Sequence, residues 1–458
     1  MKQRIITLVN SHTSSANTPR ISLYGLGVTN TAVMSILLEV FRREDITVRL
    51  DGYDGTNRIP QGVHTIVGDA ARNCIGEDVV FLSPSVRREN IISSEKTLLT
   101  SDMDIFLDDP PKNCFAISGS DGKSTVTAMC HMMLNSRFPN LFRGGNFGTP
   151  IVTVNLDSTD AFVIELSSFM LRYTNPGALR GVVTNITPNH LNWHKSMDEY
   201  VESKLTLLRS CKEAVINADD PIILQAALNI PTFTAVSCQY SHKELSKILC
   251  PEHTVTLEAG RLMVDGDAFI NVSELQKKES HNIKNFMLAT ALSLNFAKRA
   301  EIIDVGRTFT GLEHRCEAFL VRDGITFINS SIDTTPERTK ATLTGLNREV
   351  VIILGGNGKG ISPGALEAPL SRYAKKIAIY GNYRHEIKLM IEKSELCAGI
   401  PHADFNSFED AVEYAISELI AGDTLLLSPS ATGYGQFRSY AQRGEYFKNY
   451  INKKYEKI

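Results

Sequence analysis

The segment that most constrains the fold of this chain is Ile117-Ser-Gly-Ser-Asp-Gly-Lys-Ser-Thr-Val126. It predicts an apolar strand, a turn with two glycines and then a helix, because Val126–Leu134 continues with apolar residues at helical spacing. Glycines let backbone N–H groups surround phosphate oxygens, the helix N-terminus and Lys123 add positive charge, and the Ser124 hydroxyl can bind magnesium. The segment therefore predicts a nucleotide-phosphate site formed by Gly119, Ser120, Asp121, Gly122, Lys123, Ser124 and Thr125.

The spacing within this loop narrows the class of protein. The common phosphate loop, G-x-x-x-x-G-K-[ST], has a glycine six residues before the lysine, where this chain has Ile117. The shorter G-x-x-G-K-S form points away from ordinary P-loop kinases and GTPases and towards a smaller group of ATP-using ligases. The alternative is a glycine-containing turn between a strand and a helix that binds nothing.

Length and composition predict a globular, cytoplasmic protein of several domains. A chain of 458 residues corresponds to about three domains. The net charge of -3 gives no long-range attraction to nucleic acid or to an anionic membrane. No run of 18 apolar residues predicts a membrane span, and Met1–Arg20 is too polar for a signal peptide. The eight cysteines form no C-x-x-C pair, which favours reduced thiols over disulfides or a zinc site.

The N-terminal region has the order of a dinucleotide-binding half-domain. A strand at Ile21 leads into the turn Gly25-x-Gly27, helical spacing follows over Thr31–Val40, and a second strand ends at Asp51. The third glycine of that pattern is missing, because Asn30 stands near its place. A nucleotide site and an ordinary α/β turn both remain open here.

The rest of the chain alternates predicted strands and helices in two further regions. The apolar strand Ala161–Ser168 contains Glu165, a charge that is costly there unless it is paired or bound to a metal. The amphipathic run Met197–Leu208 carries Lys204, which on residue pattern alone is best explained as a solvated lysine. Short strands are predicted over Cys238–Val272. With boundaries at the Asp108–Lys112 connection and near Gly311, we expect three α/β domains over residues 1–108, 109–310 and 311–458.

Taken in order, these motifs resemble the Mur ligases, and most closely the branch that adds D-glutamate. The resemblance runs from Gly25-Leu-Gly27 to Arg443-Gly-Glu-Tyr-Phe447. Its most specific pieces are Gly119–Thr125, Gly144-Gly-Asn-Phe-Gly148, Glu165-Leu-Ser-Ser-Phe169, Asn185-Ile-Thr-Pro-Asn-His-Leu191, Tyr200–Lys204 and Gly311-Leu-Glu-His-Arg315. The resemblance implies an N-terminal Rossmann-like domain for a UDP-sugar, a central P-loop ATPase-type α/β domain with a mostly parallel sheet, and a C-terminal Rossmann-like domain for an amino acid.

The chemistry implied by the resemblance is ATP-dependent amide formation through an acyl phosphate. The carboxylate of UDP-N-acetylmuramoyl-L-alanine would attack the γ-phosphate of ATP, and the amine of D-glutamate would then displace phosphate. The implied catalytic residues are Lys123, Glu165, His190 and Lys204. Magnesium would be held by Ser124, Glu165 and His190, and by Lys204 if it is carbamylated. A monomer that binds neither nucleic acid nor membrane is expected.

The resemblance also assigns the binding residues. For the UDP-sugar they are Leu26, Val28, Thr29, Asn30, Asp51, Asn146 and Ser167; for ATP, besides the loop, they are Asn282, Asn285 and Arg315; for the amino acid they are Thr334, Lys359, Thr432 and Phe437. Each has an ordinary alternative, since asparagines cap helices and an arginine can form a surface ion pair. His190 and His194 could suggest zinc, although no ligand cluster lies nearby, and Trp193 is predicted to pack rather than to recognise a ligand.

The sequence departs from the family mainly in the third domain. Ser330 and Ile332 stand where members commonly have an acid and a lysine, and Gly433 and Gly435 stand where they have a serine and an acid. One lost neutral hydrogen bond costs on the order of 1 kcal/mol, so these changes could redirect amino-acid choice without abolishing the chemistry. Two alternatives therefore remain open: a related ligase with another amino acid or another carboxylate acceptor, and a non-catalytic nucleotide-binding relative.

Overall fold

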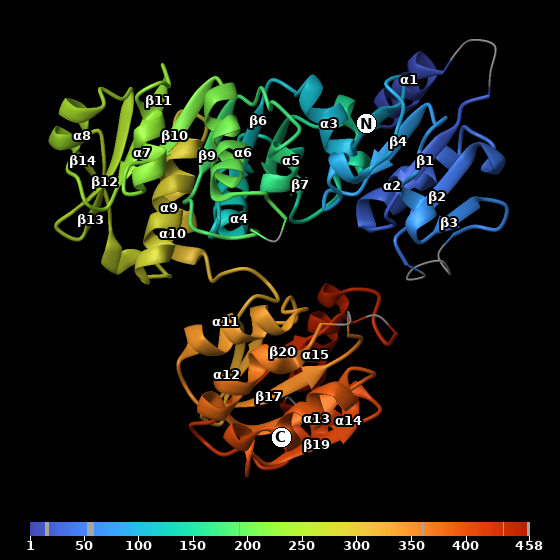
Figure 1. Cartoon of the computed structure of the whole chain (residues 1–458). Coiled ribbons are helices and arrows are strands. Elements are labelled where there is room, and N and C mark those ends of the chain that lie inside the picture. The colour runs from blue at the N-terminus through green and yellow to red at the C-terminus, as the bar shows by residue number, and fades with distance from the viewer. Residues whose placement is uncertain (14–17, 53–58, 192, 359–360, 434, 456–458) are drawn as a thin grey trace. The chain divides into compact units, whose positions relative to one another are not determined.

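The computed structural model describes residues 1–13, 18–52, 59–191, 193–358, 361–433 and 435–455. The chain forms two compact units, Met1–Thr310 and Gly311–Ile458 (Figure 1). The first unit contains a five-stranded and a nine-stranded sheet, and the second contains one six-stranded sheet. The predicted α/β class with a mostly parallel central sheet is confirmed. The division of the first unit at residue 108 stays a prediction.

The N-terminal sheet is entirely parallel and has the order β3-β2-β1-β4-β5. All four residues of β1 are buried, as expected for a strand covered on both faces. Strand order reverses at β1, so the loops after β1 and β4 meet at the edge where open α/β sheets bind ligands. The strands are β1 (Ile21–Tyr24), β2 (Ile46–Leu50), β3 (His64–Val67), β4 (Val79–Leu82) and β5 (Leu98–Thr100), and the helices are α1 (Lys2–His12), α2 (Val28–Leu38) and α3 (Asp102–Asp108).

The central sheet has the order β14-β13-β12-β11-β10-β9-β6-β8-β7, parallel except for β13 and β14. Its strands are β6 (Cys114–Ser118), β7 (Leu141–Gly145), β8 (Ala161–Glu165), β9 (Arg180–Val183), β10 (Glu213–Asn217), β11 (Phe233–Ser237), β12 (His253–Glu258), β13 (Arg261–Val264) and β14 (Asp267–Asn271). Its helices are α4 (Lys123–Leu134), α5 (Ser168–Leu171), α6 (Met197–Ser210), α7 (Pro221–Ala227), α8 (His242–Ile248), α9 (Ser280–Ser293) and α10 (Arg299–Thr308). Helices α4 and α9 pack side by side.

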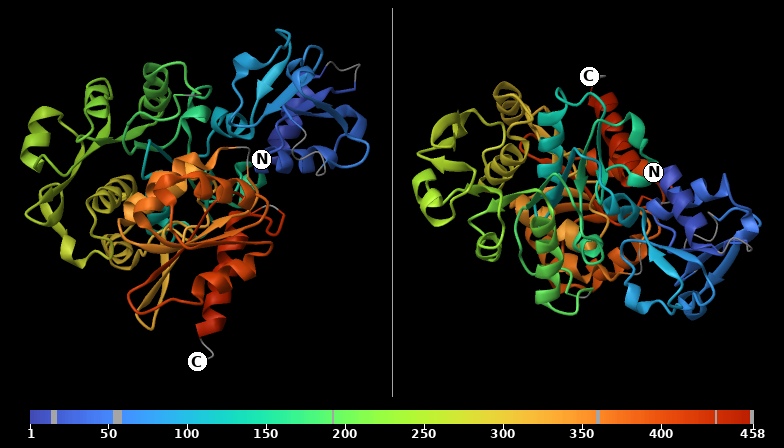
Figure 2. Two further views of the ribbon diagram at one scale, coloured as in Figure 1. Left: turned by 60° about the horizontal axis from the view of Figure 1, so that its bottom comes forward. Right: turned by 90° about the horizontal axis from the view of Figure 1, so that it is seen from above.

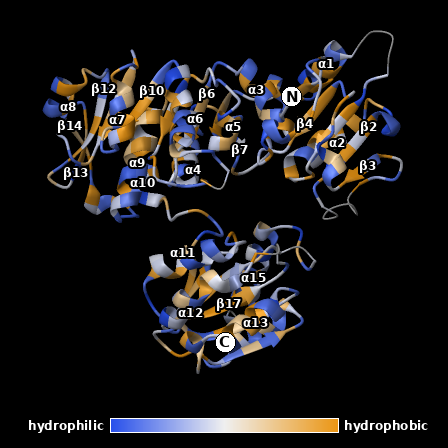
Figure 3. Cartoon of the chain, in the orientation of Figure 1, coloured by the Kyte–Doolittle hydropathy of each residue, from blue (hydrophilic) through white to orange (hydrophobic). Residues whose placement is uncertain are grey.

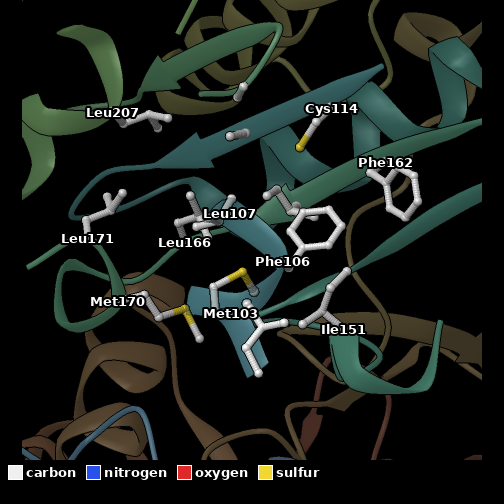
Figure 4. Close-up of a cluster of buried hydrophobic side chains, with 14 of the residues drawn as sticks. Met103, Phe106, Leu107, Cys114, Ile151, Phe162, Leu166, Met170, Leu171 and Leu207 are labelled. Carbon is white, nitrogen blue, oxygen red and sulfur yellow. The ribbon is translucent and has the colours of Figure 1, made fainter. Parts of the chain in front are cut away.

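Helix α3 packs on the central sheet with its apolar face. Figure 4 shows Met103, Phe106 and Leu107 of this helix in one cluster with Phe162 of β8 and with Ile151. The rings of Phe106 and Phe162 lie 5.3 Å apart. The last helix before the central sheet is therefore part of the core beneath β8, the strand that ends at Glu165.

The second unit is a mixed sheet of order β15-β16-β20-β17-β18-β19, in which only the β15–β16 pair is antiparallel. An apolar cluster lies on each face, so the strands are hydrophobic and the helices amphipathic (Figure 3). Helix α15 packs beside β15 and β16 (Figure 2). The strands are β15 (Glu317–Arg322), β16 (Ile325–Asn329), β17 (Val350–Gly355), β18 (Ala374–Tyr380), β19 (His402–Phe405) and β20 (Thr424–Ser430), and the helices are α11 (Pro336–Leu346), α12 (Glu367–Tyr373), α13 (Arg384–Lys393), α14 (Phe408–Ile416) and α15 (Tyr440–Tyr455).

One prediction of local structure is wrong. The run Cys238–Val272 was expected to hold only short strands, but it also contains helix α8. Ser241 caps this helix by accepting a hydrogen bond from the backbone N–H of Glu244, whose side chain bonds back to the Ser241 N–H. This capping box is a helix-start signal that outweighs the β-turn glycines further on. Among the described residues, no helix is long and apolar enough to cross a membrane.

Asp102, the first residue of α3, is an ionisable group buried in the core. Its side chain is 3% exposed, and burial raises its pKa to about 7, although hydrogen bonds from backbone groups of Met103 and Val152 act in the opposite direction. In the unfolded chain this carboxyl titrates near its usual value of about 4. Between about pH 4 and pH 7 the folded state therefore keeps a proton that the unfolded state has lost, and stability falls as pH rises.

We predict that Asp102→Asn flattens this pH dependence. The amide keeps the shape of the carboxyl and carries no charge, so at pH 8 the variant should be more stable than the parent by up to roughly 4 kcal/mol, and at pH 4 the two should be similar. Urea unfolding at both pH values measures the difference. The matched control is Asp108→Asn, at an exposed position of the same helix, which should change little. An unchanged pH dependence in Asp102→Asn would contradict the assignment.

Candidate active site

The predicted phosphate loop joins β6 to α4, and two of its positions require glycine. Gly119 has φ +142° and Gly122 has φ +80°, both in the region that side chains disfavour. A Cβ on Gly119 would lie 1.8 Å from Thr184 Oγ1, and a Cβ on Gly122 would lie 2.4 Å from Asn285 Oδ1. The loop backbone is therefore closely packed against the end of β9 on one side and α9 on the other.

The segment after β9 fixes the conformation of this loop. The backbone N–H of Ser120 donates to the Asn185 carbonyl (2.9 Å), and the N–H of Asp121 donates to Asn185 Oδ1 (2.9 Å). The Ser120 hydroxyl accepts from the N–H of Thr187 (2.9 Å) and lies 2.7 Å from the Tyr200 hydroxyl. Ser120 thus contributes its side chain to the loop's architecture.

Two lysines converge on the loop carbonyls. Lys123 Nζ donates to the carbonyls of Gly119 and Ser120, both at 2.9 Å, and Lys204 Nζ from α6 donates to the same Gly119 carbonyl at 2.6 Å. Lys204 is 2% exposed, so its interpretation as a solvated lysine is wrong. Burial, together with the charge of Lys123, lowers the pKa of Lys204 well below its usual value, against the opposing charges of Asp121 and Glu165.

Glu165 ends β8 as a buried carboxylate with one oxygen unused. Its side chain is 1% exposed, and Oε1 accepts a hydrogen bond from Asn146 Nδ2 at 2.7 Å. Oε2 is buried and has no hydrogen-bond partner among the described residues. Such an oxygen is costly unless a cation or donor occupies the space beside it. No group of three or more His, Cys, Asp or Glu side chains gathers as a metal site in the described ranges, so Mg²⁺ here would need phosphate oxygens and water as further ligands.

The two histidines after β9 have different surroundings. His190 is exposed, has φ +54° and lies with its ring 5.0 Å from that of Phe169. His194 is buried, with Nε2 3.0 Å from Ser168 Oγ and Nδ1 3.2 Å from Glu199 Oε1, and burial lowers its pKa. Both ring nitrogens of His194 thus have protein partners, which argues against a zinc site shared with His190.

The residues predicted for the rest of ATP lie in different parts of the structure. Asn285 contacts the loop at Gly122, and Ser124 and Thr125 are in the first turn of α4. Asn282 donates to Glu279 Oε2 at 3.0 Å. Arg315 belongs to the other compact unit, in the turn that precedes β15, so its position is described only within that unit.

The predicted UDP-sugar residues surround the loop after β1. Asn30 is 1% exposed, and its Nδ2 donates to the carbonyls of Tyr24 (3.1 Å), Gly25 (2.8 Å) and Phe81 (3.1 Å), so this side chain organises the loop. Asp51 accepts from the Tyr24 hydroxyl at 2.5 Å. Leu26 is buried, Val28 is exposed and Thr29 is half-buried. Asn146 and Ser167 lie in the central sheet region instead: Asn146 on Glu165, and Ser167 as the cap of α5.

The predicted amino-acid residues lie after the strands of the second unit. Thr432 Oγ1 donates to the Asn357 carbonyl at 2.9 Å, and Thr334 is half-buried. Phe437 is 7% exposed and packs 5.3 Å from the ring of Phe408, so it belongs to the core. Lys359 lies outside the described residues.

Sequence reasoning gave no role to Arg443, although the structure makes it a central contact. Its guanidinium is 0% exposed and donates to Ser331 Oγ (2.9 Å), to the carbonyls of Ser331 (2.9 Å) and Ala431 (3.0 Å) and to the Tyr380 hydroxyl (3.1 Å). It thereby ties together the ends of β16, β18 and β20. The neighbouring Gly444, a glycine inside a helix, marks close packing at this place, since a Cβ there would lie 2.4 Å from His314 Nδ1.

Comparison with known proteins finds a matching family model and similar full-length chains. A model of the Mur ligase middle domain matches residues 117–293. The chain is 29% identical over 475 residues to an Acetivibrio thermocellus protein named "UDP-N-acetylmuramoylalanine--D-glutamate ligase", covering 97% of this chain and 99% of that protein. A Clostridium kluyveri protein of the same name is 30% identical over 452 residues, covering 94% and 96%. The solved structure of UDP-N-acetylmuramate-alanine ligase MurC from Thermotoga maritima aligns with TM-score 0.55 at 16% identity, over 95% of this chain and 99% of that one, which supports the fold.

We predict that Gly119→Ala abolishes nucleotide binding, because its Cβ would displace Thr184 and open the loop. Calorimetric titration with a non-hydrolysable ATP analogue should show affinity at least about 100-fold weaker, while circular dichroism shows a folded chain. Gly122→Ala meets only the Asn285 side chain and should weaken binding less. The control is Gly345→Ala, at a helical position with nothing within 4 Å of the added Cβ. Parental affinity in Gly119→Ala would contradict the role of this loop.

Proposed function

The chain belongs to the Mur ligase family, and on that premise we propose that it joins D-glutamate to the carboxylate of UDP-N-acetylmuramoyl-L-alanine with conversion of ATP to ADP and phosphate. The product is a precursor of peptidoglycan. The observation that carries the proposal is the set of buried groups beside the phosphate loop. Glu165 has an unpartnered oxygen, and burial depresses the pKa of Lys204. The relatives named as D-glutamate ligases are similar to this chain over nearly its whole length.

The proposed reaction has two steps. An oxygen of the acceptor carboxylate attacks the γ-phosphorus of ATP, the bond from that phosphorus to the bridging oxygen breaks, and ADP leaves. The amine of D-glutamate then attacks the carbonyl carbon of the acyl phosphate, the carbon–oxygen bond to phosphate breaks, and the amine loses a proton. Lys123 and the loop N–H groups would hold the β- and γ-phosphates in line with the acceptor.

The residues present fit a magnesium ion beside the loop. The unpartnered Oε2 of Glu165 supplies a negative oxygen ligand, and the Ser124 hydroxyl and His190 are the other proposed ligands. When bound, Mg²⁺ offsets phosphate charge and so weakens the repulsion between the acceptor carboxylate and the γ-phosphate. Asn146 orients Glu165 by donating to its other oxygen at 2.7 Å.

Lys204 fits the carbamylation that the family implies. A lysine amine attacks CO₂ only in its neutral form, and burial beside Lys123 favours that form. The amine loses a proton, a nitrogen–carbon bond forms, and a cation becomes a carboxylate near Glu165. We propose that this carboxylate binds a second magnesium ion.

We propose that some of the predicted substrate residues contact the substrate and that others only shape or pack the loops. On the UDP-sugar we assign Leu26, Val28, Thr29 and Asp51 to direct contact and Asn30 to the loop's shape. On the amino acid we assign Thr334, Lys359 and Thr432 to contact and Phe437 to packing. The predicted cytoplasmic location and monomeric state stay predictions.

One observation favours a second candidate, a ligase of the same type with another amino acid. A Cβ on Gly433 would lie 3.2 Å from Phe437 Cβ and 3.3 Å from the Ser439 carbonyl oxygen, so the position is crowded for the serine that family members carry. The loop after β20 is thus built around glycine in this chain.

The test of the function is ADP release by purified protein with Mg²⁺-ATP and UDP-N-acetylmuramoyl-L-alanine. D-Glutamate should stimulate release at least tenfold over L-glutamate or D-aspartate, with one ADP per amide formed. Lys123→Met should reduce the rate at least 100-fold, because it removes the charge that holds the phosphates. Stimulation by another amino acid alone would replace D-glutamate with the second candidate, and no acceptor-dependent release would overturn both.

We predict a carbamate on Lys204. In ¹³C-bicarbonate at pH 8, carbon NMR should show a carbamate signal in the parent and none in Lys204→Ala, whose ADP release should fall at least 100-fold. Lys195→Ala is the control, since Lys195 is exposed just before α6, the helix that carries Lys204, and should keep the signal and the activity. A parental spectrum without the signal, or full turnover in Lys204→Ala, would contradict the assignment.

A further inference from the structure

The loop that carries His190 is attached through Trp193 to two different parts of the first compact unit. On one side the turn is closed by the N–H groups of Trp193 and His194, which both donate to the His190 carbonyl at 2.9 Å. The Trp193 ring lies 4.3 Å from that of Phe169 at an interplanar angle of 33°, and Phe169 in turn lies 5.0 Å from the His190 ring. Trp193 and His190 therefore contact the same side chain, Phe169, which lies four residues after Glu165 in the sequence.

On the other side, Trp193 is bound to the N-terminal sheet region. Its indole Nε1 donates to the Ser85 carbonyl at 2.7 Å, and its own carbonyl accepts from Arg87 Nη1 at 2.6 Å. The Arg87 guanidinium also lies over the indole ring, 5.2 Å from its centre. These three contacts hold both the backbone and the ring of Trp193 to the segment that follows β4.

The segment that binds Trp193 also contacts the loop after β1, which carries predicted UDP-sugar residues. The N–H of Ser83 donates to the Tyr24 carbonyl at 3.0 Å, and Ser83 Oγ lies 3.4 Å from Asn30 Nδ2. A Cβ on Gly25 would lie 2.8 Å from Ser83 Oγ, so the two loops are in close contact. Only Pro84 separates Ser83 from Ser85, whose carbonyl accepts the indole N–H. A continuous set of contacts thus runs from Gly25 through Ser83-Pro-Ser85, Trp193 and Phe169 to His190.

Hydrogen bonds and an ion pair that do not involve Trp193 also join the segment after β4 to the central sheet region. The Tyr173 hydroxyl donates to Glu89 Oε2 at 2.6 Å and accepts from the N–H of Arg88 at 3.1 Å, and Arg172 pairs with Glu89 at 3.4 Å. These contacts join the same two regions without touching Phe169 or His190. What Trp193 adds is a direct connection to the histidine, whose backbone has a left-handed φ of +54° that side chains disfavour.

We propose that Trp193 is a positioning residue that makes the placement of His190 depend on the state of the loop that binds the UDP-sugar diphosphate. The inference rests on the proposed function, because it assumes that His190 acts on the metal and that the loop after β1 holds a UDP group. Binding of the UDP-sugar acceptor would then improve the placement of His190 in the metal-nucleotide site. Coupling of this kind is reciprocal, so the metal-nucleotide must also strengthen UDP binding.

The first test uses the fact that Trp193 is the only tryptophan of the chain, so intrinsic tryptophan fluorescence reports on it alone. Titration of the parent with UDP, without nucleotide or metal, should give a saturable change in emission, because the Ser85 carbonyl is bonded to the indole N–H. Arg87→Met should reduce that change, since it frees the indole face and the Trp193 carbonyl. No emission change while calorimetry shows UDP bound would overturn the proposal.

The second test measures the coupling itself. Mn²⁺ affinity in the presence of a non-hydrolysable ATP analogue is read by electron paramagnetic resonance, with and without UDP-N-acetylmuramoyl-L-alanine. The acceptor should raise Mn²⁺ affinity at least about threefold in the parent and by little in Trp193→Leu, which loses ring and donor. Trp193→Phe keeps a ring on Phe169 and should retain part of the coupling. Tyr173→Phe keeps the ring that lies 6.4 Å from that of Trp193 and loses only the hydroxyl contacts with Glu89 and Arg88, so it should keep the parental ratio.

The outcomes separate the inference from the function on which it rests. Equal coupling in Trp193→Leu and the parent would overturn the role of Trp193 while leaving ADP release by the parent intact. If Tyr173→Phe loses as much coupling as Trp193→Leu, Trp193 has no specific role in positioning His190 and only packs at this junction. Absence of acceptor-dependent ADP release by the parent would instead overturn the proposed function, whatever the fluorescence shows.

Discussion

The burial of two ionisable side chains beside one phosphate loop is the constraint on which the site depends. Glu165 ends β8 with one oxygen bonded to Asn146 and the other without a partner, and Lys204 reaches the Gly119 carbonyl from α6. A buried charged group without partners costs several kcal/mol in a protein that is stable by only about 5–15 kcal/mol. On the proposed function, a cation beside the unpartnered oxygen of Glu165 would remove this cost.

The sequence predicted the local elements of this site better than its contacts. The strand, glycines and lysine of Ile117–Val126 predict a phosphate loop, because each of them determines the structure of its own neighbours in sequence. Glu165 is recognisable as a charge inside an apolar strand. Lys204 was not recognisable in this way, because its burial comes from the packing of α6 against a loop about 80 residues earlier. The hydrogen bonds of Arg443 and Trp193 were not predicted for the same reason, since their partners Ser331 and Ser85 lie 112 and 108 residues earlier in the chain. The missed helix α8 is different: its capping box was present in the sequence.

The structure shows what some polar residues do in the second unit, where the sequence departs most from the family pattern. Ser330 is fully buried and its hydroxyl accepts from the Cys316 N–H at 3.0 Å, so it supports the turn that carries Arg315. Asp333 is also buried, and its carboxylate accepts from Ser428 and Thr342, which makes it part of the scaffold. The proposed amino-acid site of this chain would be formed by the loops after β16, β17 and β20, and Arg443 connects the first and the last of these.

The most direct measurement follows the oxygen atoms of the acceptor. With UDP-N-acetylmuramoyl-L-alanine labelled with ¹⁸O in its free carboxylate, an acyl-phosphate route transfers one carboxylate oxygen to the phosphate released in each turnover. Mass spectrometry of the phosphate should therefore find one ¹⁸O per molecule at full labelling, in the presence of D-glutamate. Phosphate without the label, alongside continued amide formation, would contradict the account of this site as one that activates a carboxylate on the γ-phosphate of ATP.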